Sequence, residues 1–437
     1  WGDYIPYIDT TEIIGTDNLH DPKGIIKESQ RLAAKAFGAK ETIYSINGTT
    51  GGIYIALSAV TNAGDKILIQ RNSHKSMYNG SILNRLNIEY IYPKYNEKYH
   101  ILTGIDPDDI ERKLQKDENI KVVTLVYPNY YGICSDIKKI AEIVHKYSRI
   151  LLVDEAHGSH FKFSDKLPLS ALEAGADIVV QSTHKTLPSF TQTSMIHVGT
   201  HRVDIDKLRE MSVLYQSTSP SFVLMASLEI ARAYMEGEGK EILENSLILQ
   251  EETIKELEKI NRVHVFTGDK EDTTIYHHDI SKILFRVDGI PGTNLNRILT
   301  KNYNIDLEMS DYYHALALAS LMNDKKDYEK LIEAVKDIAN KEAYEEIIPI
   351  SVEIKEPKIV LPIYKAFYSN KKVIDLKNSA GRISTSFIIP YPPGIPLICP
   401  GEEITEELIQ YIEFLMDKGI EIIGFVGYNR GKIGVVD

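Results

Sequence analysis

The stretch RILLVDEAH, residues 149–157, shows most clearly how this chain folds. Its centre is continuously apolar, and the polar residues Asp154, Glu155 and His157 follow directly. Continuous apolarity is typical of strands buried on both faces, as in a parallel sheet covered by helices. Four other apolar runs bounded by turn-forming residues have the same character: KILIQ (66–70), IEYIYP (88–93), KVVTLVYP (121–128) and ADIVVQS (176–182). We therefore predict an α/β fold with a mostly parallel sheet sandwiched by helices.

Helical segments are expected between these strands, and the pattern changes after Pro220. Helical spacing marks Ile25–Phe37, Ile53–Val60 and Asp136–His145 in the first half of the chain. The second half is expected to contain a helix-rich stretch (222–260), the strand SKILFRVDG (281–289), a helix over Asp324–Glu342 and a strand over Arg382–Ile389. We predict an N-terminal segment (1–20), a large domain (21–280) and a smaller C-terminal α+β domain (281–437). Because the chain begins with Trp1 rather than Met, we expect a further segment upstream.

Composition excludes several classes of protein. The formal net charge of −12 argues against non-specific nucleic-acid binding. No apolar run approaches the roughly 18 residues that a membrane-spanning helix needs, and no signal peptide is evident. The two cysteines, Cys134 and Cys399, cannot form a disulfide framework, and no Cys/His cluster suggests a metal. We expect a cytoplasmic protein that binds neither nucleic acid nor membrane and holds no metal ion.

Polar groups follow several predicted strands, where the carboxyl ends of a parallel sheet face one crevice. The stretch NGTTGG (47–52) comes directly before a helix, so Thr49, Thr50 and Gly51 are placed to present amides and hydroxyls to a phosphate. No Lys-Ser/Thr pair follows, which argues against a nucleotide P-loop. A glycine-rich turn with a capping threonine explains the stretch equally well.

Three single residues at strand ends are candidates for chemistry, and each has a structural alternative. Asp154 needs a cationic partner if it is buried, such as a protonated ring nitrogen, although a metal or a helix cap would also serve. His74 in QRNSHKS (70–76) either stacks on a ligand or caps a helix at the surface. Lys185 in QSTHKTL (181–187) would be a nucleophile toward carbonyls if burial lowers its pKa; otherwise its amine reaches solvent.

Taken together, these groups fit one ligand, pyridoxal 5′-phosphate. Its aldehyde needs an amine for a Schiff base, and its pyridinium needs an anion. Its phosphate needs hydrogen-bond donors, and its ring needs a flat side chain to stack on. Lys185 would form the Schiff base, Asp154 would pair with the ring nitrogen, and His74 would stack on the ring. Thr49, Thr50 and Ser182 would hold the phosphate.

The same residues carry a resemblance to the Orn/Lys/Arg decarboxylase family of fold type I pyridoxal-phosphate enzymes, in its compact bacterial form without an N-terminal receiver-like domain. The motifs are NGTTGG, RNSHKS, YPNYYGICSD, LLVDEAHGSHF, GADIVVQSTHKTLPSFTQTSMIHV, TSPSFVLMASL and GRISTSFIIPYPPGIPLICPGE, and the resemblance runs from about residue 10 to about residue 410. Two departures stand out. A segment like PFHMPGHK, which precedes this region in the family and helps to close the site, is absent from the sequence, and Asn129 stands where the family commonly has Thr.

The resemblance implies a role for each matching position. Lys185 binds the cofactor, Asp154 pairs with its ring nitrogen, and His74 stacks on the ring. Near the phosphate and the Schiff base lie Thr49, Thr50, Ser182 and His184. Ala156 packs against the ring face opposite His74, with His157 beside it. Thr218 and Ser219 reach the cofactor phosphate of a neighbouring subunit. A homodimer or larger homo-oligomer with shared active sites is therefore expected.

The reaction implied is decarboxylation of a basic amino acid to the corresponding amine and CO₂, as in polyamine metabolism. We expect arginine as the first substrate, then lysine, then ornithine. Glu308 is the first candidate to bind the cationic end of the substrate, with Asp311 behind it, although helix capping or solvation explains both carboxylates equally well. Arg382 is a candidate for the α-carboxylate, as in aminotransferases, or for a structural ion pair. His74 or Lys185 would return a proton to Cα.

Two alternatives stay open at the level of sequence. An aminotransferase or an aldolase-type enzyme would use the same Lys185 and Asp154. A catalytically degenerate, cofactor-binding regulator would explain the missing upstream motif, although a regulator has no need of a Schiff-base lysine.

Overall fold

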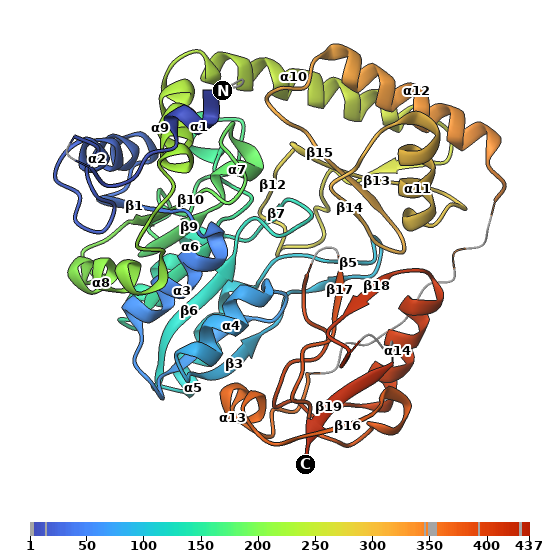
Figure 1. Cartoon of the computed structure of the whole chain (residues 1–437). Coiled ribbons are helices and arrows are strands. Elements are labelled where there is room, and N and C mark those ends of the chain that lie inside the picture. The colour runs from blue at the N-terminus through green and yellow to red at the C-terminus, as the bar shows by residue number, and fades with distance from the viewer. Residues whose placement is uncertain (1–3, 14, 345–346, 348–355, 392–393, 428–430) are drawn as a thin grey trace.

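The computed structural model describes residues 4–437 except residues 14, 345–346, 348–355, 392–393 and 428–430. A seven-stranded sheet in the order β1-β10-β9-β8-β6-β2-β3 forms the centre of the large domain (Figure 1). Its strands are β1 (Glu41–Ser45), β2 (Lys66–Gln70), β3 (Asn87–Ile91), β6 (Ile120–Val126), β8 (Ile150–Asp154), β9 (Ile178–Gln181) and β10 (Ser194–Val198). Neighbours from β9 to β3 pair in parallel, whereas β10 pairs antiparallel with both β1 and β9. The predicted mostly parallel sheet is confirmed.

Helices cover both faces of this sheet, and this explains why the central strands β6, β8 and β9 are mostly apolar and buried. Strand β8 shows the arrangement: Leu151 and Val153 pack into one core, while Leu152 packs into the other. The covering elements include α2 (Ile25–Phe37), α3 (Gly48–Val60), α4 (Lys75–Leu83), α5 (Pro107–Lys116), α6 (Ile137–Lys146), α8 (Ile205–Tyr215) and α9 (Phe222–Glu236). Alternating residues of one strand therefore supply two separate hydrophobic cores.

A second sheet lies beside the large domain and packs against the long helices at the top of Figure 1. Its order is β11-β13-β15-β14, and all its pairs are antiparallel. The strands are β11 (Val263–Val265), β13 (Lys282–Val287), β14 (Met309–Ser310) and β15 (Ala315–Leu318), and the helices are α10 (Gly239–Glu258), α11 (Gly292–Tyr303) and α12 (Lys325–Lys341). The predicted strand at 281–289 and the predicted helix at 324–342 are confirmed. A short pair, β7 (Ile133–Cys134) with β12 (His277–His278), joins this region to the large domain.

The C-terminal part, red in Figure 1, has a core of its own around α14 (Glu406–Asp417). It contains α13 (Ile363–Phe367) and the strand pairs β16 (Lys371–Asp375) with β19 (Lys432–Val436), and β17 (Ile389–Tyr391) with β18 (Glu421–Ile423). A buried ion pair between Arg71 and Glu402, 3.3 Å long, joins it to the large domain.

The predicted strand over Arg382–Ile389 is wrong. This segment makes isolated bridges at Ile383, Ser384 and Ile388 rather than a continuous ladder. Ser384 explains part of the difference, because its hydroxyl bonds to both the amide and the carbonyl of Ser386 and so folds the backbone locally.

None of the helices that the structure describes is long and apolar enough to cross a lipid bilayer.

Candidate active site

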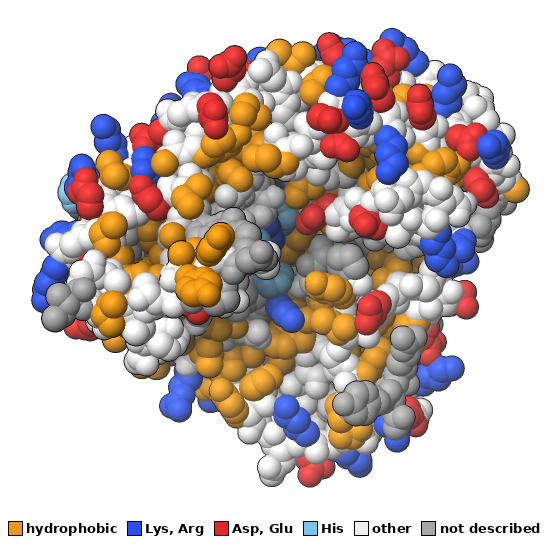
Figure 2. Space-filling view, turned by 45° about the horizontal axis from the view of Figure 1, so that its top comes forward, with side chains coloured by type: hydrophobic (Ala, Val, Ile, Leu, Met, Phe, Trp, Pro, Cys, Tyr) orange, Lys and Arg blue, Asp and Glu red, His pale blue; other side chains and the backbone are white. Residues whose placement is uncertain are grey.

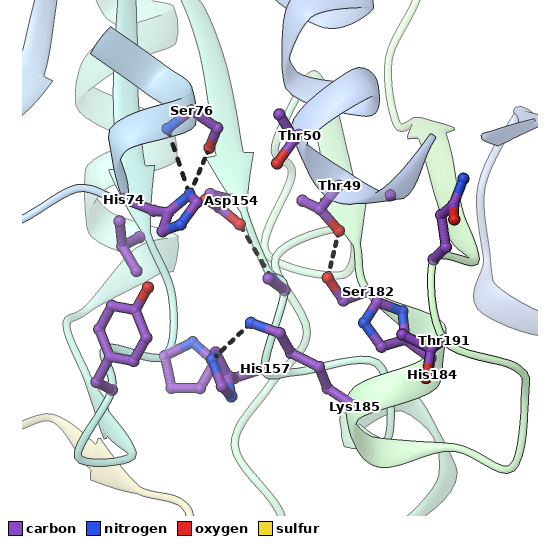
Figure 3. Close-up of a pocket in the computed structure, with 16 residues that line it drawn as sticks. Thr49, Thr50, His74, Ser76, Asp154, His157, Ser182, His184, Lys185 and Thr191 are labelled. Atoms are coloured by element: carbon purple, nitrogen blue, oxygen red, sulfur yellow. Dashed lines mark hydrogen bonds between the residues drawn. The ribbon is translucent and has the colours of Figure 1, made fainter. Parts of the chain in front are cut away.

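A cavity of about 440 Å³ opens at the carboxyl ends of β6, β8 and β9, where the sequence predicted a ligand site. Figure 2 shows histidine side chains within a hollow near the middle of this face, and Figure 3 shows the residues that line it. Such a volume suits a small organic ligand. The lining residues are Gly48, Thr49, Thr50, His74, Ser76, Val126, Pro128, Tyr130, Asp154, Ala156, His157, Ser182, His184, Lys185, Thr191 and Gln192.

Lys185 reaches the cavity from a helical turn rather than from the strand itself. Strand β9 ends at Gln181, and the short helix α7 (Thr183–Thr186) follows it. The amine points toward the ring of His157, with 3.0 Å between Nζ and Nε2 (Figure 3). Burial lowers the pKa of Lys185, while Asp154 and Glu308 act in the opposite direction. A larger share of the free amine is therefore present at neutral pH, which favours attack on a carbonyl carbon.

Asp154 ends β8 and is 4% exposed. One of its oxygens accepts a hydrogen bond from the amide of Ala156 at 3.2 Å. Burial raises its pKa to about 6, against the opposing effects of Lys185 and that amide. A buried carboxylate with this little support is stabilised by a cation brought by a ligand, and a protonated pyridine nitrogen is such a cation.

Hydroxyl groups form one end of the cavity, at the start of helix α3. Thr49 lies in the first turn of this helix and hydrogen-bonds to the hydroxyl of Ser182 (Figure 3). Thr49 also lies 3.3 Å from the hydroxyl of Ser194, and Thr50 lines the cavity beside it. Hydroxyls together with the amides of a helix N-terminus suit a phosphate group.

His74 caps a helix, and its ring also lines the cavity, so stacking on a ligand stays a prediction. It caps α4, because its Nδ1 accepts the amide of Ser76 at 3.3 Å and lies 2.9 Å from the Ser76 hydroxyl. Its ring also lines the cavity. Burial, with help from Lys185 and Lys75, lowers its pKa to about 4, so the ring is neutral at physiological pH. A flat, uncharged ring of fixed orientation is suited to stacking on an aromatic ligand.

The cavity therefore offers an amine, a buried carboxylate, a hydroxyl cup and a flat ring around one space. Pyridoxal phosphate needs these four groups, so the residues present fit this cofactor. The fit rests on side chains that follow four strands, β1, β2, β8 and β9, and share one cavity, not on any one of them alone.

Comparison with known proteins agrees with this fit. The family model for the major domain of Orn/Lys/Arg decarboxylase matches residues 1–282, and the model for the C-terminal domain matches residues 355–432. The chain belongs to the Orn/Lys/Arg decarboxylase family. It is 37% identical to an arginine decarboxylase of Bacillus subtilis over 423 residues, covering 95% of this chain and 86% of the relative.

More distant relatives share the fold. A lysine decarboxylase of Pseudomonas aeruginosa is 24% identical over 91% of this chain and 68% of its own length. The crystal structure of a lysine decarboxylase of Francisella novicida superposes with a TM-score of 0.81 at 24% identity, covering 96% of this chain and 73% of that one. An alanine–glyoxylate aminotransferase of Nostoc reaches a TM-score of 0.60 at 17% identity, which marks the shared fold type I architecture. The family membership supports a decarboxylase over the aminotransferase alternative.

Other residues predicted for the cofactor site of this decarboxylase fold fall into two groups. His184, Ala156 and His157 line the cavity, and Nδ1 of His184 lies 2.7 Å from the carbonyl oxygen of Thr193. Gly51 is not among the lining residues; it is buried within α3. Thr218 and Ser219 are exposed and do not line the cavity.

The three predicted substrate residues differ in their surroundings. Glu308 is exposed, yet its charge acts on both Lys185 and the buried Lys282. Asp311 instead holds a turn together, accepting the amides of Tyr313 and His314 at 2.7 and 2.6 Å. Its other oxygen accepts the Tyr131 hydroxyl at 2.7 Å. These internal bonds engage both oxygens of Asp311.

Arg382 lies in the C-terminal part and donates a hydrogen bond to the carbonyl oxygen of Val436 at 3.1 Å. It is not among the residues that line the cavity.

Sequence reasoning missed several lining residues, of which Tyr130 is the most prominent. It follows the end of β6, and its ring lies 5.2 Å from that of His157. The rule that singled out Asp154 also applies to Tyr130, because β6 and β8 are neighbours in the sheet. Ser76, in the first turn of α4, and Thr191 and Gln192, in a turn, carried no such signal, since only the folded chain brings them to the cavity.

Proposed function

We propose that this decarboxylase uses pyridoxal phosphate to convert a basic amino acid into the corresponding amine and CO₂, with arginine ahead of lysine and ornithine. The observation that carries the proposal is the arrangement of Lys185 and Asp154 around one cavity that also holds the neutral ring of His74. The preference for arginine is supported by the similarity to relatives that are arginine decarboxylases.

Each wall of the cavity would hold one part of the cofactor. Lys185 would carry the aldehyde carbon, Asp154 would keep the ring nitrogen protonated, and His74 would stack on the ring. Thr49, Thr50, Ser182 and His184 would bind around the phosphate and the Schiff base, while Ala156 and His157 would pack beside the ring. When bound, the cofactor supplies an electron sink for the pair of electrons left on Cα as CO₂ departs.

The chain's own residues would carry out the proton transfers. Lys185, once its amine is released, would return a proton to Cα; its place in the cavity and its hydrogen bond to His157 support this role. His74 is the other donor to consider, but its low pKa keeps it uncharged at neutral pH and favours the stacking role.

Glu308 is proposed to bind the guanidinium or ammonium at the far end of the substrate. Its charge stabilises the cationic forms of Lys185 and Lys282, so it acts on the same space as the reacting groups. Asp311 and Arg382 are weaker candidates for substrate contacts, because the first is bonded to backbone amides and the second to a carbonyl of the C-terminal part.

A homodimer or larger homo-oligomer is proposed, with Thr218 and Ser219 reaching the cofactor phosphate of the neighbouring subunit. Their exposure in a single protomer leaves them accessible for such a contact. We further propose that the protein works in the cytoplasm and feeds polyamine metabolism.

The test is to incubate the protein with pyridoxal phosphate and, in separate reactions, arginine, lysine or ornithine, and to identify the amine products by mass spectrometry. Agmatine as the main product, formed only when Lys185 is intact, is the expected result. Cadaverine or putrescine in its place would change the substrate but keep the reaction. If no amine forms although the cofactor's Schiff base absorbs as usual, the proposed reaction is wrong.

A further inference from the structure

A second lysine lies behind the cavity wall, on the far side of His157. Lys282 begins strand β13, outside the large sheet, and its side chain is 0% exposed. Its Nζ lies 2.7 Å from Nδ1 of His157, whose other nitrogen, Nε2, lies 3.0 Å from Nζ of Lys185. One imidazole thus links two lysine amines.

The surroundings fix this second lysine in place. Gly132, at φ +87°, packs against its stem so closely that a Cβ at position 132 would lie 2.8 Å from the Cβ of Lys282. The rings of Tyr130 and His157 pack edge to face, with 5.2 Å between their centres. A side chain at position 132 would therefore displace the stem of Lys282, while Tyr130 packs on the histidine.

Hydrogen-bond chemistry couples the three groups. A neutral imidazole has one donor nitrogen and one acceptor nitrogen, whereas a lysine ammonium only donates. Burial lowers the pKa of His157 far below its usual value, with further lowering by Lys282 and Lys185, so this ring is neutral. Both lysines therefore cannot donate to His157 at once, and when one is an ammonium bonded to the ring, the other accepts as a free amine.

We propose that Lys282 and His157 form a proton relay that sets the protonation state of Lys185. The inference rests on the proposed function, because it concerns the amine that binds the cofactor. In one state the Lys282 ammonium donates to Nδ1, and Nε2–H donates to the free amine of Lys185. In the other, Nδ1–H donates to the free amine of Lys282, and the Lys185 ammonium donates to Nε2.

The two states differ by two coupled proton transfers, which together move one positive charge across the ring. An N–H bond of Lys282 breaks as Nδ1–H forms, and Nε2–H breaks as a new N–H bond forms on Lys185, so the positive charge passes from one lysine to the other. The first state keeps Lys185 nucleophilic for binding the aldehyde. The second loads it with the proton that Cα receives after CO₂ leaves.

Charges around the relay support both states. Burial lowers the pKa of Lys282 to about 8, Glu308 and Asp279 oppose that effect, and Lys185 adds to it. Lys185 in turn has Asp154 and Glu308 as anionic neighbours. The titratable groups that face the relay are Lys185, Lys282, Glu308, Asp279, Asp154, His74, His160, His278 and Tyr130. Because anions lie near both lysines, neither state leaves a buried cation without a counter-charge.

The first test uses the ligand-free wild-type protein and needs no variant. Nitrogen-15 resonances of the His157 ring are followed by NMR from about pH 6 to about pH 10. The relay predicts a ring that stays neutral while both of its nitrogen shifts change with a midpoint near that of Lys282. Shifts that do not change in this range, or a ring that gains a full charge, would overturn it.

The second test compares two variants, Lys282→Met and Lys282→Arg, with the exposed Lys326→Met as the matched control. Methionine removes the site where the proton is stored, so Lys185 keeps it. Schiff-base formation with pyridoxal phosphate, followed by absorbance near pH 7, should then slow about tenfold, which corresponds to one pKa unit on the amine. The rate should recover as the pH rises.

The Lys282→Arg variant distinguishes a proton relay from a purely structural role of Lys282. It keeps a donor and a charge at Nδ1 but does not give up its proton. Cofactor binding should therefore stay within about twofold of wild type, while kcat for amine formation falls by about a hundredfold, as expected for loss of a proton donor. If Lys282→Met and Lys282→Arg lose cofactor binding and amine formation to the same extent, the relay is wrong and Lys282 has a packing role. The melting temperature of each variant checks that it folds.

These outcomes separate the relay from the proposed function. If no amine forms from any basic amino acid but His157 responds to pH as described, the function is wrong and the relay stands. If amine forms normally in Lys282→Arg, the relay is wrong and the function stands.

Discussion

Asp154 and Glu155 are neighbours in the chain, yet they belong to two different regions of the molecule. Asp154 lines the cavity and accepts one amide at 3.2 Å. Glu155 lies away from the cavity, where its two oxygens accept the amide of Ala171 at 2.7 Å and the side-chain amide of Gln181 at 2.6 Å. The side-chain oxygen of Gln181 lies 3.1 Å from Nε2 of His197, so this second region is a polar network within the large domain.

The comparison shows what distinguishes a functional buried acid from a structural one. Burial raises both pKa values, to about 6 for Asp154 and to about 8 for Glu155. The larger shift belongs to the residue that does not line the cavity. A perturbed pKa alone therefore does not identify an active-site residue. A buried acid that faces a cavity and has few hydrogen-bond partners within the protein is the better indicator.

Asp154→Asn should produce the largest effect on activity. The amide carries no charge to keep a ring nitrogen protonated, so kcat should fall by about a hundredfold to ten-thousandfold. Steady-state assays of amine formation measure this. Activity within threefold of wild type would remove Asp154 from the cofactor site.

The same substitution should stabilise the ligand-free protein. The folded-state pKa of about 6 lies above the ordinary 3.8. Asp154 therefore lowers the free energy of unfolding as the pH rises from about 4 to about 6, and the whole decrease persists at higher pH. At pH 7 the Asn variant should gain about 2–3 kcal/mol in free energy of unfolding, at about 1.4 kcal/mol per pKa unit. Urea unfolding of both ligand-free proteins measures the difference, and a loss of stability would contradict it.

His74→Ala should weaken cofactor binding about tenfold, because a stacked ring contributes about 0.5–1.5 kcal/mol. His74→Phe is the matched control, since it keeps the flat ring and loses the hydrogen bonds to Ser76. Fluorescence titration with pyridoxal phosphate gives both affinities. If Phe weakens binding as much as Ala does, capping of α4 rather than stacking is the role of His74.

Glu308→Gln should raise the KM for arginine about tenfold with a smaller change in kcat, because it removes one charge from the far end of the substrate. Asp306→Asn, an exposed neighbour two positions earlier, is the control and should leave KM unchanged. An unchanged KM in Glu308→Gln would show that Glu308 does not bind the cationic group of the substrate.

Glu155→Gln should have the smallest effect on activity, within about threefold, because Glu155 does not line the cavity. Its effect is on the pH dependence of stability. The folded-state pKa of about 8 exceeds the ordinary 4.5, so Glu155 contributes stability at low pH that is lost as the pH rises from about 4.5 to about 8. Unfolding curves across this range should lose that slope in the Gln variant.

Much of this arrangement could be predicted from the sequence because one physical rule governs it. Strands buried on both faces are continuously apolar, and the polar residues at their carboxyl ends must meet at one edge of a parallel sheet. This rule brought Asp154, His74 and Thr49 to one cavity, with Lys185 one helical turn beyond its strand.

The rest depends on packing between regions far apart in the chain. Lys282 begins an ordinary apolar strand, and only the folded structure brings its amine to His157, 125 residues earlier. Arg382–Ile389 has the composition of a strand, but local hydroxyl–backbone bonds of Ser384 interrupt it. Neither outcome follows from periodicity or from strand-end position.

The central claim, that this cavity holds pyridoxal phosphate on Lys185, has one direct test. The protein is incubated with the cofactor, reduced with borohydride to fix the Schiff base, digested and examined by mass spectrometry. A pyridoxyl group on the peptide that contains Lys185, absent from Lys185→Ala, is the predicted result. A label on Lys282 or another lysine, or no label at all, would contradict the account.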